Sequence, residues 1–267
     1  MSLPTFNLRQ MMEAGVHFGH HARRWNPKMS QYIYGKKDNI HIIDLQKTYP
    51  MFYSALAIAK EVASNGGKVL FVGTKRQAQD IVKQHAERCG QYYVNYRWLG
   101  GMLTNWKTIY KSISRLVKLN NMFEKNETEG YTKKELLNLK KEQGKLQQEL
   151  GGIMSMGGQP DLIFIVDVTK EDLAVKEAKK LGIPVVGICD TNSDPEIVDY
   201  PVPGNDDAIR AINFYCDMVA SAVLDGIQAE VAAQGVRVEE FADGESKVAK
   251  KRTSKKAKEE VQAADEE

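Results

Sequence analysis

The chain contains two hydrophobic patterns that alternate along its length. Residues 68–72, 161–168 and 183–190 are short, continuous apolar runs bounded by turn-forming residues, which is typical of strands buried on both faces. Each of these runs is followed by apolar residues at helical spacing. The spacing predicts one helix that ends near Gly90, a second between Thr169 and Gly182, and a third that begins at Asp206. Buried strands interleaved with helices predict an α/β fold, with a mostly parallel sheet covered by helices on both faces.

Residues 104–150 interrupt this alternation with two long helical patterns and no strand. Apolar or amide residues recur at heptad spacing in both, first at Ile109, Ile113, Leu116, Asn120 and Phe123, then at Leu136, Leu139, Gln143, Leu146 and Leu150. Thr132 and Glu135 have the spacing of a capping box for the second helix.

Antiparallel pairing of these helices brings Leu116 to Leu146 and Asn120 to Gln143, so the two polar side chains can hydrogen-bond and set the register. We therefore expect an inserted antiparallel helical hairpin, a coiled coil, with arms of about 20 residues or roughly 30 Å. An ordinary pair of core helices is the alternative. The narrow seam and charged flanks favour a projecting arm.

The patterns divide the chain into three parts. Residues 1–103 and 151–229 form a discontinuous α/β domain, residues 104–150 the inserted hairpin, and residues 230–267 a C-terminal extension. From residue 245 onward the extension is rich in lysine and has no aromatic residue, so we expect it to be disordered, with some electrostatic affinity for polyanions.

Composition excludes several classes of protein. The 267 residues are 42% apolar and 27% charged, as in a globular chain, and no apolar run approaches the roughly 18 residues of a membrane helix. The first 15 residues lack the basic and apolar regions of a signal peptide. Cys89, Cys189 and Cys216 are widely spaced among apolar neighbours, which indicates reduced packing residues in an intracellular protein.

Charge is distributed unevenly along the chain, although the formal net charge is only +2. Residues 1–120 contain 18 lysine and arginine residues against 6 acidic ones, together with all five histidines, whereas residues 121–245 contain 12 against 24. A half this basic suits a polyanion, and the acidic half is expected to face water or basic partners.

Catalytic and nucleotide-binding motifs find little support. The turn at Gly73-Thr74-Lys75 follows a strand, but Gly67 and Gly73 are too far apart for a phosphate loop and Thr74 stands where its lysine belongs. The glycine-rich residues 151–158 precede a strand instead of following one, and no G-x-G-x-x-G is present. We therefore predict no enzyme, no catalytic residue and no cofactor.

A divalent metal ion is a weaker alternative. His17, His20 and His21 lie close together in sequence, and aspartates that could complete a site lie far downstream at Asp190, Asp194, Asp199, Asp206 and Asp207. Neither spacing matches a metal motif. The simpler interpretation has the histidines contacting phosphate or capping backbone groups, and the aspartates capping turns and the last helix, so no metal is predicted.

The basic half has the composition of an RNA-binding surface, because cations neutralise phosphates and aromatic rings stack on exposed bases. Lys107, Lys111, Arg115 and Lys118 form a basic stripe at helical spacing, while Trp25, Tyr32 and Trp98 have the alternative role of core anchors. The full set of candidate RNA-binding residues is His20, His21, Arg23, Arg24, Trp25, Lys28, Lys36, Lys37, Lys75, Arg76, Arg97, Lys107, Lys111, Arg115 and Lys118.

The same residues carry a family resemblance. AGVHFGHHARRWNPKM at residues 14–29, RWLGGMLTN at 97–105 and GICDTNSDPEIVDYPVPGNDDAIRA at 187–211 closely resemble the bacterial small-subunit ribosomal protein S2 family. Shorter matching stretches at 39–48, 71–78 and 159–167 occur in family order, so the resemblance covers about residues 8–227.

The resemblance implies a flavodoxin-like sheet with an inserted helical hairpin, and a cytoplasmic protein that assembles on small-subunit rRNA without catalysing a reaction. It also implies contacts with neighbouring small-subunit proteins, including the large one that captures mRNA, and no membrane or small-molecule substrate. A free-standing α/β regulator that binds RNA or a nucleotide is the alternative.

Overall fold

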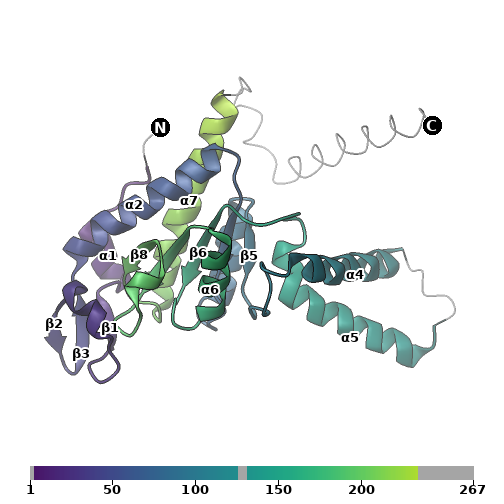
Figure 1. The fold of residues 1–267 in the computed structure, drawn as a ribbon, viewed down its shortest axis with the longest axis horizontal. Coiled ribbons are helices and arrows are strands. Elements are labelled where there is room, and N and C mark those ends of the chain that lie inside the picture. The colour runs from purple at the N-terminus through teal and green to yellow at the C-terminus, as the bar shows by residue number, and fades with distance from the viewer. Residues whose placement is uncertain (1–2, 126–130, 234–267) are drawn as a thin grey trace.

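The computed structural model describes residues 3–125 and 131–233 of the chain, and its centre is a five-stranded parallel sheet (Figure 1). The strand order is β5-β4-β6-β7-β8. The strands are β4 Val69–Val72, β5 Tyr92–Val94, β6 Leu162–Val166, β7 Val185–Cys189 and β8 Tyr200–Pro203. This is the strand order of a flavodoxin-like doubly wound sheet, so the predicted α/β class and parallel sheet are confirmed.

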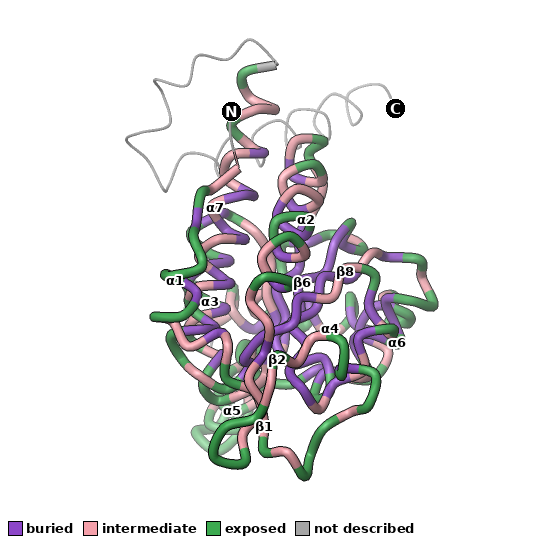
Figure 2. Tube along the Cα trace, turned by 90° about the vertical axis from the view of Figure 1, so that its left-hand side faces the viewer, coloured by how far each residue is buried: buried purple, intermediate pink, exposed green. Residues whose placement is uncertain are grey.

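Helices cover both faces of this sheet and create two cores. On one face Val69 and Phe71 of β4 pack against α2 (Leu45–Ser64), α3 (Gln79–Arg88) and α7 (Ile209–Ala233). Leu70 and Val72 point to the other face, where α6 (Asp172–Leu181) covers the sheet. Figure 2 shows the buried strands β6 and β8 between α7 and α3 on one side and α6 on the other. Because both faces are covered, β4, β6 and β7 are buried along their whole length, which explains their continuous apolar sequences.

The N-terminal region adds a second, smaller sheet that the hydrophobic pattern did not predict. Helix α1 (Leu8–Ala14) is followed by the antiparallel strands β1 (Phe18–His21), β2 (Ile33–Lys37) and β3 (Ile40–Ile43), in the order β1-β3-β2. A 3₁₀ helix, η1 (Pro27–Tyr32), lies between β1 and β2. These strands are short and only partly buried, so they lack the apolar runs that identified the central strands.

The two helices of residues 104–150 lie side by side and extend away from the sheet (Figure 1). They are α4 (Trp106–Glu124) and α5 (Lys133–Leu150), and Gln143 Nε2 donates the expected hydrogen bond to Asn120 Oδ1 at 2.8 Å. The capping box at Thr132 and Glu135 is also present. Leu119 is buried beside the predicted seam positions of α4, although the heptad spacing did not include it.

The observed helix boundaries correct two sequence-based predictions. Helix α6 begins at Asp172 and not after Thr169, whose hydroxyl instead lies 3.0 Å from that of Ser193. Helix α7 begins at Ile209 and not at Asp206. The side chain of Asn205 accepts hydrogen bonds from the two backbone N–H groups just before α7, which leaves Asp206 free for a different role.

Other predictions can be compared directly. Cys89, Cys189 and Cys216 are buried and unpaired, as expected for packing residues. Among the described residues, no helix is both long and apolar enough to cross a membrane. Residues 230–233 of the predicted C-terminal extension form the end of α7, so the expectation of disorder is wrong there, and the rest of the extension lies outside the described part of the chain.

A buried carboxylate fixes the loop that leads from β5 into α4. Glu177, on α6, accepts hydrogen bonds from the backbone N–H groups of Gly101 (2.7 Å), Leu103 (3.0 Å) and Thr104 (3.0 Å), and from the indole N–H of Trp98 (3.2 Å). Burial opposes ionisation, but the donors at Thr104 and Leu103 outweigh it and hold the pKa of Glu177 below its usual value. One side chain thereby binds three backbone N–H groups of the loop and the indole of Trp98.

We expect Glu177→Gln to lower the free energy of unfolding by about 2 kcal/mol at pH 7, because the amide replaces one acceptor with a donor that faces backbone N–H groups. Urea denaturation measures this change, with the exposed Glu124→Gln as control. The depressed pKa means that the stabilisation is present above the unfolded-state pKa and lost in acid, so the difference from wild type should shrink toward pH 3. A variant as stable as the control at pH 7 would contradict this role.

Candidate nucleic-acid interface and the carboxylate cluster beside it

Several candidate RNA-binding residues come together on the small N-terminal sheet. Strand pairing places Lys36 opposite His41 and His21 opposite Ile40. The backbone N–H of Ala22 donates to the carbonyl of Asn39 at 2.8 Å, which holds the loop after β1 against the β2–β3 turn. The cationic candidates of this region are exposed, namely His21, Arg23, Arg24, Lys28, Lys36 and Lys37.

Exposed aromatic rings accompany these charges. Trp25 is 42% exposed and its ring lies 5.5 Å from that of His41, while Tyr34 on β2 is 78% exposed. Trp98, in contrast, is buried and bonded to Glu177. The alternative role of core anchor is therefore confirmed for Trp98 and wrong for Trp25. The N-terminal sheet presents both of the groups that bind single-stranded RNA, cations and open aromatic faces.

The remaining candidates lie elsewhere. Lys107, Lys111, Arg115 and Lys118 are on α4, at the opposite end of the molecule from β1–β3 (Figure 1). The three lysines are exposed, whereas Arg115 forms an ion pair with Glu142 through Nε at 3.0 Å and Nη2 at 3.1 Å. The basic half of the sequence thus forms two separate groups of charges with the central sheet between them.

Two candidate lysines are neutralised within the protein. Lys28 Nζ lies 2.7 Å from Asp194 and 2.6 Å from Glu196 at the surface. Lys75 Nζ lies within 2.8 Å of three carboxylates, and its side chain is only 14% exposed. The acidic partners follow about 90 to 170 residues later in the chain, so spacing gave no indication of these pairs. Arg76, next to Lys75, remains exposed.

The partners of Lys75 belong to a carboxylate cluster at the carboxyl ends of the parallel strands. Lys75 follows β4, Asp167 follows β6, Asp190 follows β7, and Asp206 and Asp207 follow β8. Lys75 Nζ is 2.8 Å from Asp167 Oδ2, 2.7 Å from Asp206 Oδ1 and 2.8 Å from Asp207 Oδ1. Asp167 adopts a left-handed backbone conformation (φ 67°), which is rare for a residue other than glycine and common at functional sites.

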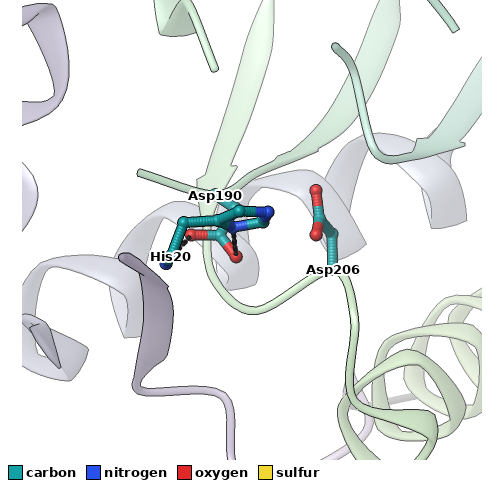
Figure 3. A group of neighbouring side chains, drawn as sticks. All are labelled: His20, Asp190 and Asp206. Atoms are coloured by element: carbon teal, nitrogen blue, oxygen red, sulfur yellow. Dashed lines mark hydrogen bonds and ion pairs between the residues drawn. The ribbon is translucent and has the colours of Figure 1, made fainter. Parts of the chain in front are cut away.

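Strand β1 brings His20 into this cluster (Figure 3). The His20 backbone N–H donates to Asp190 Oδ1 (3.1 Å) and Thr191 Oγ1 (3.0 Å), and its imidazole Nδ1 lies 2.9 Å from Asp190 Oδ2. The approach requires Gly19, because a Cβ atom there would lie 2.6 Å from Cγ2 of Thr191. His20 therefore attaches the small sheet to the end of the large one.

Electrostatics favour protonation of His20 and Asp206. The Asp190 carboxylate is the main cause that raises the pKa of His20 to about 9, against the opposing effect of burial. Burial, together with Asp167 and Asp190, raises the pKa of Asp206 to about 7, although Lys75 opposes this shift. Burial lowers the pKa of Lys75, but the attraction of Asp206 and the hydrogen-bonded carboxylates is stronger and raises it overall.

The cluster includes part of the metal site considered from the sequence. One donor atom from each of His20, Asp190 and Asp206 lies within 4.8 Å of the others, a set that suits a divalent ion. His17 and His21 do not join them, Asp194 pairs with Lys28, and Asp199 accepts a hydrogen bond from the backbone of Val185. Because His20 would have to lose its proton to coordinate, a metal would compete with the proton that Asp190 stabilises.

We expect stability to fall as pH rises through this cluster. The pKa of His20 is higher in the folded protein than its ordinary 6.5, so its contribution is complete below pH 6.5 and is lost toward pH 9. Between pH 6.5 and 9 the unfolding free energy of the wild type should fall by about 2 kcal/mol, after allowance for solvent screening. His20→Gln should not show this decrease. Urea denaturation between pH 6 and 9 tests this, with His21→Gln as control. Equal pH slopes for His20→Gln and wild type would exclude the role.

The fold and the exposed charges define a class, a doubly wound α/β protein with basic and aromatic groups at its periphery. Comparison with known proteins is more specific. A family model described as ribosomal protein S2 matches residues 11–226, and the chain belongs to this family. The resemblance seen in the sequence is thus confirmed, and the chain is a structural protein rather than an enzyme.

Similar proteins named small ribosomal subunit protein uS2 align along most of the chain. The protein of Rhodospirillum rubrum is 62% identical over 238 residues, which cover 89% of this chain and 91% of that protein. The protein of Rhodospirillum centenum is 60% identical over 236 residues, covering 88% and 90%. The protein of Dinoroseobacter shibae is 58% identical over 244 residues, covering 91% and 94%.

Proposed function

We propose that this chain is a structural component of the small ribosomal subunit in the cytoplasm, where it binds rRNA and neighbouring ribosomal proteins and so supports translation. Family membership and the names of its relatives support the ribosomal role. The observation that carries RNA binding is the group of exposed cations and aromatic rings on the N-terminal sheet.

Contact at this sheet depends on charge and shape. His21, Arg23, Arg24, Lys36 and Lys37 would neutralise phosphates, and the release of counterions makes such binding sensitive to salt. The open face of Trp25 suits an unpaired base. Lys75 is left out of the interface because three carboxylates surround its ammonium group, and Lys28 contributes less because two acidic side chains already neutralise it.

The helix pair supplies a second contact. Residues 104–150 act in this proposal as a coiled-coil arm inserted into a discontinuous domain of residues 1–103 and 151–229, with 230–267 as a C-terminal extension. Lys107, Lys111 and Lys118 on the exposed side of α4 would meet rRNA, assisted by Arg97 near the base of the arm. Acidic surfaces of the later half would face neighbouring proteins, including the large ribosomal protein that captures mRNA, since they are repelled by phosphate.

Sedimentation of the tagged full-length protein through a magnesium-containing sucrose gradient tests the ribosomal role. We expect comigration with small subunits that persists in moderate salt. Protein that stays at the top of the gradient would instead support the alternative, a free-standing regulator that binds RNA or a nucleotide.

The double variant Arg23→Glu, Arg24→Glu tests the proposed interface. We expect its occupancy on small subunits to fall about tenfold, because two attractive phosphate contacts become repulsive. Lys179→Glu with Lys180→Glu makes the same change of charge on the exposed side of α6 and should leave occupancy near wild type. Quantitative mass spectrometry of purified subunits provides the measurement, and equal losses for the two double variants would refute a localised contact.

A further inference from the structure

A cleft of about 660 Å³ lies beside the carboxylate cluster, and it shares with the cluster the segments that follow β4 and β6. Its lining comes from the segments that follow β4, β5 and β6 and from the last turns of α5. The chain leaves β4 toward α3 on one face of the sheet and leaves β6 toward α6 on the other. Adjacent strands whose connections leave in opposite directions create the crevice in which doubly wound proteins bind their ligands.

Two aromatic residues, Tyr96 and Trp98, line the cleft. Tyr96 is 50% exposed, so its side chain is accessible to a ligand. Trp98 is buried and its indole N–H is already bonded to Glu177, so Trp98 is held in place and contributes apolar surface to the lining. A half-exposed ring in the lining of a cleft offers a stacking surface to a planar group.

The charged groups of the cleft favour a ligand with a phosphate. Arg97 and Lys145 are exposed and form no ion pair among the residues that the structure describes. Lys170 Nζ donates to the backbone carbonyl of Thr74 at 3.1 Å, and its other protons are available to a ligand. These three cations outnumber the two carboxylates of the lining.

Both carboxylates have identifiable roles. Glu171 accepts hydrogen bonds from the backbone N–H (3.0 Å) and the hydroxyl of Thr74, so it holds the wall of the cleft together. The carboxylate of Glu149 remains available to accept a hydrogen bond, for example from the amino group of a base. Cations, a stacking surface and one acceptor together match a nucleotide better than they match inorganic phosphate or an apolar ligand.

We propose that this cleft binds one unpaired nucleotide of RNA, whose base stacks on Tyr96 and whose phosphate is neutralised by Arg97 and Lys145. The proposal deepens the RNA-binding function and rests on it. RNA is a better source than a free nucleotide, because no glycine in the described part of the chain lines the cleft, which therefore lacks the glycine-rich backbone cradle that di- and triphosphates require.

Fluorescence anisotropy of the full-length protein with a fluorescein-labelled octa-adenylate tests this proposal. We expect Tyr96→Ala to weaken binding about tenfold and Tyr96→Phe to retain it, because the ring and not the hydroxyl does the stacking. Lys145→Glu should weaken binding about fivefold, whereas Lys141→Glu, one turn earlier on α5 and outside the lining, should change it less than about twofold. Equal losses for the two lysine variants, or wild-type binding by Tyr96→Ala, would overturn the proposal.

Competition with AMP distinguishes the two sources of a nucleotide. Displacement of the octa-adenylate only by millimolar AMP supports an RNA site, and displacement by micromolar AMP would overturn it in favour of a free nucleotide. The result is separable from the ribosomal role: loss of gradient comigration in Arg23→Glu, Arg24→Glu alongside unchanged octa-adenylate binding in Tyr96→Ala would refute the cleft and leave the proposed function standing.

Discussion

The ammonium group of Lys75 is the interaction on which the arrangement of the molecule depends. It neutralises carboxylates that follow β6 and β8, at an edge of the sheet where several aspartates are withdrawn from water. Removing one partner of a buried charge pair costs about 3–5 kcal/mol, because the remaining charge has no solvent to stabilise it. The strand ends are consequently held in one arrangement, and His20 extends it by joining Asp190 to the small N-terminal sheet.

A second buried carboxylate acts in the same way on the loop that follows the edge strand β5. Glu177 binds three backbone N–H groups of the loop between β5 and α4, so hydrogen bonds to α6 help to set the direction in which the helix pair leaves the sheet. It also fixes Trp98, which lines the cleft. Polar groups that are fully bonded in a low-dielectric interior specify geometry more strongly than apolar contacts of the same size.

These two anchors give the central sheet the role of a rigid spacer between two sets of surface charges. The N-terminal sheet carries one set and α4 the other, and neither set packs into the core itself. Such rigidity favours binding to RNA at separated places. The conformational entropy of the chain is already lost when the protein folds, so binding does not have to order the two surfaces again. The acid side chains between them remain within the protein as internal partners of Lys75 and His20.

The sequence by itself determined the features that depend on local pattern. Continuous apolar runs identified β4, β6 and β7, because these strands are buried on both faces. Heptad spacing placed Asn120 opposite Gln143, because the repeat of a helix fixes which of its residues share a face. The remaining strands could not be predicted from such patterns. Strand β5 has three residues, β8 contains two prolines, and β1–β3 are only half buried, so none has a distinctive period.

The composition of the candidate interface was also readable from sequence, since Arg23, Arg24, Lys36 and Lys37 are exposed as expected. Only the tertiary structure decided which cations are free. Lys75 and Arg97 look alike in sequence, yet one is enclosed by carboxylates from residues 167 to 207 and the other lines an open cleft. The physical reason is that Coulomb interactions act through space, and parallel strands bring to one edge residues that the chain separates by a hundred positions.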